Sequence, residues 1–269
     1  MGNRPSRTSG IAQPERGLGS PRAGGFSLID VLVTMAVMMV LMSLLSPALL
    51  SAQESARRVR CASNMRQIGM AIQMYTADHN GRVPPALYGV PPPPPPTDRN
   101  RRLPPPPAQP EWSGDTMFAR LPAVPEIRAA ANGTWDGLGY LYPTYLTHPG
   151  ALYCPSHRGQ HPFLEYTDDW IAQNGLIAAN YQYRVPPASL YLSDMDPRTS
   201  LVADGMMSKS DYNHKVGNNT LKADLTVSWF SDFNGAVYKS LPDVSPKFST
   251  RQMGRARAWD TLDGFGAKF

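Results

Sequence analysis

Cysteine is scarce in this 269-residue sequence, and several common functional signatures are missing from it. Only Cys61 and Cys154 occur, which fits a single disulfide but does not fix the redox compartment. There is no phosphate-binding loop, dinucleotide fingerprint or internal repeat. There is also no long basic stripe and no interleaving of basic with aromatic residues, so no nucleic-acid partner is expected.

Charged side chains are absent from residues 31–50, although they make up 17% of the whole chain. A helix of that length measures roughly 30 Å, the thickness of the hydrocarbon core of a bilayer. The mean hydropathy of −0.34 is that of a soluble-type protein, so the apolar stretch is a local feature. We expect a membrane span over residues 26–50. The alternative is a buried helix of a soluble core, for which the stretch is too long and lacks a polar face.

The helical pattern continues after the apolar stretch, now with one apolar stripe. Its members recur at spacings of three and four residues: Cys61, Met65, Ile68, Ile72 and Tyr75. Asn80-Gly81 supplies a stop signal, so one helix is expected from about Phe26 to Asp78, amphipathic over residues 51–80. Pro47 lies inside it and predicts a kink or local unwinding.

Proline is concentrated in the middle of the chain, where 18 of the 28 prolines lie between residues 84 and 155. Two polyproline runs flank a basic patch made of Arg99, Arg101 and Arg102. We expect residues 81–134 to form a proline-rich loop or insert in polyproline II form. The alternative is a docking ligand for a proline-reading partner.

A compact, β-rich domain is expected over residues 135–269. The aromatic-rich stretch 135–146 should pack against the helix stripe, and strands are expected at 180–185, 200–205 and 220–230. In the last of these, apolar and polar residues alternate with the period of a half-buried strand. Residues 251–269 show no clear element. The expected architecture is α+β, with one long helix laid on a small antiparallel sheet.

The segment GGFSLIDVL, residues 24–32, lies where a basic leader meets the apolar stretch. Residues 1–25 are rich in Gly, Pro, Ser and Arg. Their small residues come before the apolar stretch, whereas a secretory signal peptide is cut after it. This order resembles the prepilin leader of type IV pilins and type II secretion pseudopilins. In those families a membrane peptidase cuts after a glycine on the cytoplasmic side and methylates the new N-terminal residue, usually Phe.

The resemblance assigns roles residue by residue. Gly25 matches the glycine before the cut, and Phe26 matches the methylated N-terminus. Residues 27–29 fill the usual [ST]-L-I positions. Asp30 falls at the fifth mature position, where the family normally has Glu, and Pro47 falls at the twenty-second, where a proline is common.

Asp30 places a carboxylate directly before an uncharged apolar stretch. The free-energy cost of a charge at this position needs a physical explanation. A charge at the bilayer centre costs about 2.5–3.5 kcal/mol on insertion scales, and less near the edge, where Asp30 lies. In a bundle of such helices, Asp30 could pair with the amine of Phe26 on its own chain or a neighbour, which rewards the correct register. The alternative is that Asp30 caps the helix N-terminus.

A second resemblance covers the region after the span. The stretch SAQESARRVRCASNMRQIGMAIQMYTADHNGRVPP is similar to the corresponding region of large DUF1559-type prepilin-like proteins, and ALYCPS is similar to their later C-P-S element. The C-terminal signature of that family is a His, nine residues, then Asp-Gly. Here His214 is followed by nine residues and Asp224, with Leu225 in place of the glycine.

These resemblances imply a structural subunit rather than an enzyme. Its filament would be a type IV pilus or a type II secretion-like pseudopilus. The implied partners are a prepilin peptidase/methyltransferase, other pilin or pseudopilin subunits, and the inner membrane. The implied location is single-pass in the inner membrane with a periplasmic C-terminal domain, then a periplasmic or surface filament. The alternatives are a permanently membrane-anchored envelope binding module and, third, an anchored hydrolase or metalloprotein.

No cofactor is expected, although two metal alternatives stay open. Cys61 and Cys154 are candidates for a disulfide that ties the domain to the helix, or for two separate buried thiols. Cys154, His157 and His161 have metal-ligand spacing, which makes zinc an alternative. Acidic loop residues make calcium another, without the spacing of an EF-hand: Asp194, Asp196, Asp204 and Asp211.

Overall fold

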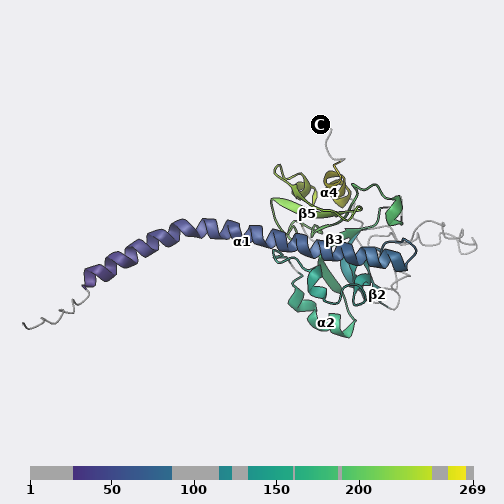
Figure 1. The fold of residues 1–269 in the computed structure, drawn as a ribbon, viewed down its shortest axis with the longest axis horizontal. Coiled ribbons are helices and arrows are strands. Elements are labelled where there is room, and N and C mark those ends of the chain that lie inside the picture. Colours follow the sequence, from purple (N-terminus) through teal and green to yellow (C-terminus); the bar gives the residue numbers. More distant parts are fainter. Residues whose placement is uncertain are drawn as a thin grey trace, which may run out of the picture. The chain divides into compact units, whose positions relative to one another are not determined.

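The computed structural model describes residues 27–86, 115–122, 133–159, 161–186, 190–243 and 254–264 (Figure 1). The chain divides into two compact units, Met1–Leu49 and Leu50–Phe269. The described part of the first unit is the N-terminal portion of one helix. The second unit contains the rest of that helix and the whole sheet.

Helix α1 runs from Leu28 to Asp78, over 51 residues. Every side chain from residue 27 to residue 50 is exposed, so this portion has no covered face. Among the described residues it is the one helix long and apolar enough to cross a membrane, judged by length and composition. Pro47 lies inside α1 without interrupting it, so the local unwinding predicted there is not observed.

The part of α1 in the second unit is amphipathic. The predicted stripe is confirmed, since all five of its members are buried: Cys61, Met65, Ile68, Ile72 and Tyr75. Gly69 lies against the sheet, where a Cβ would be 3.1 Å from a methyl carbon of Leu221. The helix ends where predicted, with Asn80 and Gly81 both in the left-handed region, at φ of 54° and 82°.

Six antiparallel strands form one sheet in the order β2-β1-β3-β4-β5-β6. Their bounds are β1 Asp115–Leu121, β2 Thr134–Trp135, β3 Ile177–Arg184, β4 Ser200–Asp204, β5 Gly217–Lys222 and β6 Val227–Ser231. The other helices of the described residues are α2 Thr167–Ala172, α3 Ala236–Ser240, α4 Gly254–Leu262, and the short 3-10 helices η2 Gly137–Leu141, η3 Pro149–Leu152, η4 Phe163–Tyr166 and η5 Leu192–Asp194. The predicted α+β class, a long helix on a small antiparallel sheet, is confirmed.

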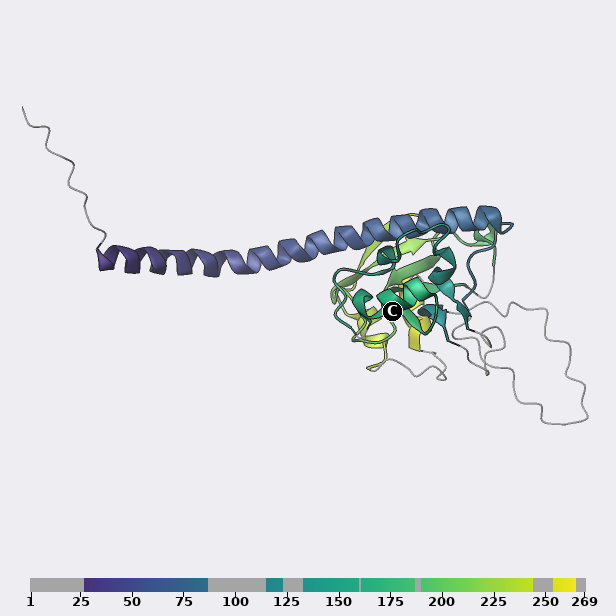
Figure 2. The same ribbon diagram turned by 90° about the horizontal axis from the view of Figure 1, so that it is seen from below.

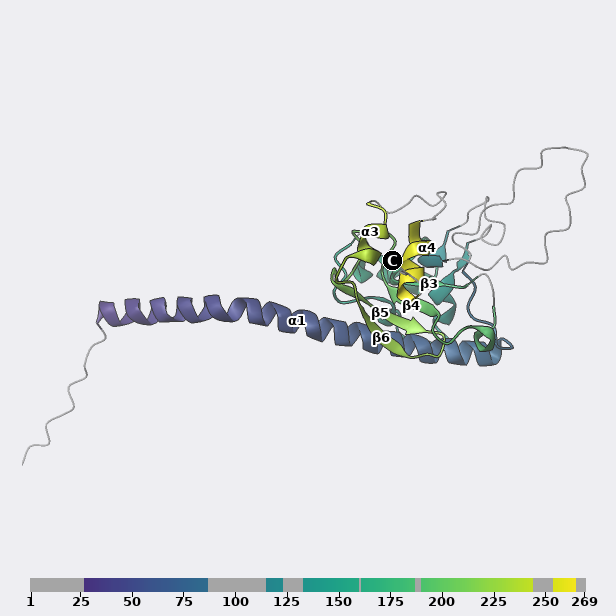
Figure 3. The same cartoon turned by 90° about the horizontal axis from the view of Figure 1, so that it is seen from above.

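The sheet of the second unit is covered on both faces. Residues 50–78 of α1 lie along one face, while α3 and α4 lie on the other (Figures 2 and 3). Strand β4 shows the two sides, because Val202 belongs to the core under α1 and Ala203 to a smaller core with Trp259 of α4. Alternate strand residues point to opposite faces, which produces this division.

The aromatic stretch 135–146 packs on the helix stripe, as predicted. The ring of Tyr75 meets Tyr145 edge-on at a centroid distance of 5.6 Å and Tyr140 at 6.4 Å. Edge-to-face rings at this spacing add to the stability that apolar burial supplies. The hydroxyl of Tyr145 also donates to Asp78 at 2.9 Å, near the end of α1.

The prediction of one strand at 220–230 was wrong, because the chain reverses there as the β5–β6 hairpin. The Asp224 carboxylate accepts hydrogen bonds from the backbone N–H of Thr226 at 2.9 Å and from its hydroxyl at 2.6 Å. Such local side-chain bonds favour a turn over a continued strand. Leu225 takes φ of 64° in this turn, at the position where the DUF1559-type signature has glycine.

Two further elements differ from expectation. Strand β1 lies inside the range 81–134 that was expected to be a proline-rich loop, and it pairs with β3. Helix α4 lies in 251–269, where no element was predicted; its buried residues Ala258, Trp259 and Leu262 fit a helical period. The polyproline runs and their basic patch lie outside the described residues.

Leu225→Gly should raise the free energy of unfolding by about 0.5–1 kcal/mol. A left-handed backbone costs an ordinary L-residue about 1–2 kcal/mol, and glycine escapes that cost but adds entropy to the unfolded chain. Denaturant titration of the full chain in detergent measures the change. Leu225→Ala is the matched control: it keeps the Cβ and should bring no gain, so equal stabilisation by alanine would contradict the explanation.

Candidate functional site: an uncovered apolar helix and a buried cysteine–histidine cluster

The start of α1 is closed by a capping box. The backbone N–H of Ser27 donates to Asp30 Oδ2 at 3.1 Å, while the N–H of Ile29 donates to the Ser27 hydroxyl at 3.4 Å. Both bonds satisfy donors that have no partner within the helix. In the single chain, therefore, Asp30 takes part in the cap from the first turn of α1, while Ser27 occupies the N-cap position that the alternative gave to Asp30. Gly25 and Phe26 lie outside the described residues.

The apolar surface of α1 is larger than a soluble monomer leaves in water. Sixteen large apolar side chains between residues 28 and 50 are each 44–82% exposed. The hydroxyls of Thr34 and Ser43 donate back to carbonyls of the same helix, at 2.9 and 2.7 Å. Their polar groups therefore need no partner from water. Such a surface can be covered by lipid or by other helices of the same kind.

In the second unit, a disulfide joins α1 to the segment after η3. Cys61 and Cys154 are both buried, 93 positions apart, with a Cα–Cα distance of 5.4 Å. The bond links the covered part of the helix to a loop that leads into the sheet. A cross-link between such distant positions restricts the unfolded chain and so stabilises the folded one.

His214 lies beside this disulfide and is buried. Its Nδ1–H donates to Glu54 Oε1 at 2.6 Å, and its Nε2 lies 3.5 Å from Cys154 Sγ. Glu54 also accepts a hydrogen bond from Ser156 at 3.0 Å. Burial works against the charge of Glu54, but the hydrogen bonds from His214 and Ser156 outweigh it and hold the pKa of Glu54 below its usual value.

Asp204, the last residue of β4, completes the cluster. Its Oδ2 lies 3.5 Å from His214 Nε2 and accepts two hydrogen bonds from Asn219, at 2.6 Å from the backbone and 3.0 Å from the side chain. Its Oδ1 is buried and has no hydrogen-bond partner among the described residues. Burial raises the pKa of Asp204 to about 6, against the opposing effects of His214 and Asn219.

The other histidines predicted beside Cys154 have different partners. His157 Nδ1 lies 2.6 Å from Asn213 Oδ1, and His161 Nδ1 lies 2.7 Å from the Tyr166 hydroxyl. Burial lowers the pKa of both imidazoles. Among the described residues, the group of potential metal ligands whose ligand atoms lie within 4.8 Å of one another is Cys61, Cys154, Asp204 and His214.

The predicted signature pair is not brought together. His214 is in the buried cluster, whereas Asp224 is exposed in the β5–β6 turn and bonds Thr226. Of the acidic residues considered for calcium, only Asp204 belongs to this cluster; Asp194 bonds Ser193, Asp196 pairs with Arg198, and Asp211 accepts from Ser208.

Glu54 was not singled out from the sequence. One signal was available, since Glu54 precedes Cys61 by seven residues and so shares its helix face two turns earlier.

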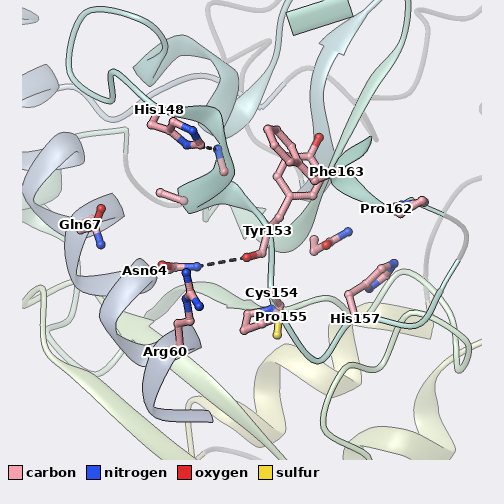
Figure 4. Close-up of a pocket in the computed structure, with 13 residues that line it drawn as sticks. Arg60, Asn64, Gln67, His148, Tyr153, Cys154, Pro155, His157, Pro162 and Phe163 are labelled. Carbon is pink, nitrogen blue, oxygen red and sulfur yellow. Dashed lines mark hydrogen bonds between the residues drawn. The ribbon is translucent and has the colours of Figure 1, made fainter. Parts of the chain in front are cut away.

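A pocket of about 610 Å³ borders the cluster on the side of Cys154 (Figure 4). Its α1 wall carries Arg60, Asn64 and Gln67, and Asn64 donates to the Tyr153 carbonyl at 3.1 Å. The opposite wall includes Phe163. The pocket is thus lined by polar groups of the helix and an aromatic ring of the domain.

Asp204→Asn should make the stability of the folded chain less dependent on pH. The raised pKa of Asp204 means that its folded form favours the proton, so wild-type stability is highest below the unfolded pKa near 4. It then falls as the pH rises to about 6. Between pH 4 and 6, wild type should lose about 2 kcal/mol relative to Asp204→Asn. Denaturant titrations across that range measure the difference, and a difference that stays constant would contradict the assignment.

Comparison with known proteins agrees with this architecture. Residues 50–264 match the family described as proteins of unknown function, DUF1559. The chain is also 32% identical over 81 residues to type II secretion system core protein G of Pectobacterium carotovorum subsp. carotovorum. That similarity covers 30% of this chain and about half, 51%, of the relative. No solved structure matched significantly. Since the family match takes in most of the chain, from the covered part of α1 to the end of α4, the protein belongs to the DUF1559 family.

Proposed function

We propose that this protein is a structural subunit of a type II secretion-like pseudopilus or a type IV pilus. One observation carries the proposal: an uncharged helical stretch, exposed on all sides, continues without a break into a helix whose stripe is buried against a sheet. Lipid would cover the exposed stretch before assembly, and the same stretch of neighbouring subunits would cover it afterwards. The similarity to a type II secretion core protein supports this direction.

The proposed cleavage of the leader after Gly25 fits the start of α1 at Leu28. A prepilin peptidase/methyltransferase would cut after Gly25 and methylate Phe26. Because α1 begins at Leu28, the mature chain would then consist almost from its first residue of this helix. The basic leader would stay in the cytoplasm, and the domain formed by residues 50–269 would lie in the periplasm. Other pilin or pseudopilin subunits and the inner membrane are the partners.

Asp30 would have two successive partners in this scheme. In the single chain it accepts from the backbone of Ser27, a capping interaction worth about 1 kcal/mol. After cleavage, the charged amine of Phe26 on a neighbouring subunit would offer a stronger, charge-assisted partner in an apolar surrounding. The exchange of partner would occur only at the correct register, so it would act as a check on assembly.

Substitutions of Asp30 separate these two roles. Asp30→Asn keeps an acceptor for the cap and removes the charge, whereas Asp30→Glu keeps the charge. We expect leader cleavage in both variants. Incorporation into sheared filaments should fall at least tenfold in Asp30→Asn and persist in Asp30→Glu. Immunoblots of the sheared and membrane fractions measure incorporation.

Thr34→Ala is the matched control, because Thr34 lies one turn further along and its hydroxyl donates to the Val31 carbonyl of its own helix. It should assemble like wild type. Normal incorporation of Asp30→Asn would contradict the pairing. Cleaved wild-type protein that is found only in membranes would instead support the alternative, a permanently anchored envelope binding module.

A further inference from the structure

Four potential metal ligands converge in the buried cluster, and two of them are the sulfurs of the disulfide. The sulfurs of Cys61 and Cys154, a carboxylate oxygen of Asp204 and a ring nitrogen of His214 all lie within 4.8 Å of one another, and all four residues are buried. His214 Nε2 is 3.5 Å from both Cys154 Sγ and Asp204 Oδ2. With metal–ligand bonds of about 2.0–2.3 Å, the ligand atoms of a tetrahedron lie roughly 3.3–3.8 Å apart. The two distances from Nε2 fall in that range, and the two sulfurs, which are bonded to each other in the disulfide, reach it only when that bond is broken.

The hydrogen bond between His214 Nδ1 and Glu54 also fits a metal site. Nδ1–H donates to Glu54 at 2.6 Å, so Nε2 presents its lone pair toward the sulfurs and Asp204. A carboxylate that orients a ligating imidazole in this way is a regular feature of zinc sites. Glu54 is itself held by Ser156, which fixes the direction of the imidazole.

Asp204 supplies a second, independent indication. Its Oδ1 is fully buried and accepts no hydrogen bond among the described residues, although Oδ2 of the same carboxylate accepts two. A buried carboxylate oxygen without a partner is destabilising unless a donor or a cation approaches it. Because the oxygen 3.5 Å from His214 Nε2 is Oδ2, a cation would remove that penalty by binding both oxygens of the Asp204 carboxylate.

We propose that reduction of the Cys61–Cys154 disulfide turns this cluster into a binding site for a thiophilic, tetrahedral divalent cation such as zinc. A thiol or phosphine reductant supplies two electrons, and the two sulfurs take up two protons as the S–S bond breaks. Each thiol then releases its proton to the solvent when it binds the cation. Cys61, Cys154, His214 and Asp204 are the ligands, and Glu54 is the positioning residue for His214.

The cation would therefore replace the disulfide as the cross-link between α1 and the segment after η3. The disulfide joins α1 to the segment after η3 under oxidising conditions, and the cation would join the same two segments when the cysteines are reduced. This inference concerns the second unit alone and does not depend on filament assembly.

Cobalt(II) provides the direct probe, since thiolate ligation gives it a charge-transfer absorption that other ligands do not. The full chain in detergent is kept oxidised or reduced with a water-soluble phosphine, and Co²⁺ is added to each sample. The reduced chain should bind about one Co²⁺ with the thiolate band, and Zn²⁺ should displace it. The oxidised chain should show no such band. A reduced wild-type chain without the band would overturn the proposal.

Variants locate the ligands. His214→Gln should abolish the band in the reduced chain, and Glu54→Gln should weaken zinc affinity about 10–100-fold while leaving the band. His157→Gln is the matched control, because His157 is half-buried near Cys154 but bonds Asn213, and it should bind like wild type.

Mass mapping of the Cys61–Cys154 bond in each oxidised variant shows whether it has folded. If His214→Gln does not form this disulfide, it has not folded, and the zinc affinity of Glu54→Gln tests the proposal instead. Unchanged zinc affinity in Glu54→Gln, or equal loss in His157→Gln, would contradict the assignment.

Discussion

The structure depends on the packing of one helix stripe against one sheet. The buried stripe from Cys61 to Tyr75 packs closely on the sheet. At Gly69 there is little room for a larger side chain, because a Cβ there would crowd Leu221. Apolar burial supplies most of the stability of such contacts, and close packing makes them specific. Because only the second half of α1 has this stripe, the sheet covers only residues of that half. The uncharged first half remains for another apolar environment, either lipid or protein.

A polar cluster lies near the start of the covered part of α1. Glu54, His214 and Asp204 come from the helix, the loop after β4 and the end of β4, and they surround the disulfide. Buried ionisable groups destabilise a fold unless each has a partner, so this arrangement specifies how the helix and the sheet meet. The cluster also brings together two sulfurs, an imidazole and a carboxylate, which are potential metal ligands. The redox-dependent metal site is proposed there for that reason.

The sequence predicted those helices and strands whose residues show a clear periodicity or turn signal. The spacing of the helix stripe, the Asn80-Gly81 stop and the strands at 180–185 and 200–205 were all readable from periodicity and turn chemistry. The β5–β6 hairpin was missed because apolar alternation continues through the turn, where Leu225 takes a left-handed conformation instead of the expected glycine. Strand β1 was missed because the proline-rich composition around it dominated the interpretation of the whole range 81–134.

The candidate site was less predictable, since its members are far apart in the sequence. Glu54 and His214 are separated by 160 positions, and only the folded chain brings them together. Cys154 was considered for both a disulfide and a metal, and the disulfide is observed. His157 and His161, its neighbours in the sequence, have other partners in the fold. Asp30 was identified from the sequence, whereas its bond to Ser27 became visible only in the structure.

We propose that the uncovered half of α1 becomes the N-terminus of a processed, assembling subunit. Mass spectrometry of the N-terminal peptide, from the protein isolated from its native membranes, tests this proposal. A peptide that starts at N-methylated Phe26 is expected. An N-terminal peptide that retains residues 1–25 would contradict it.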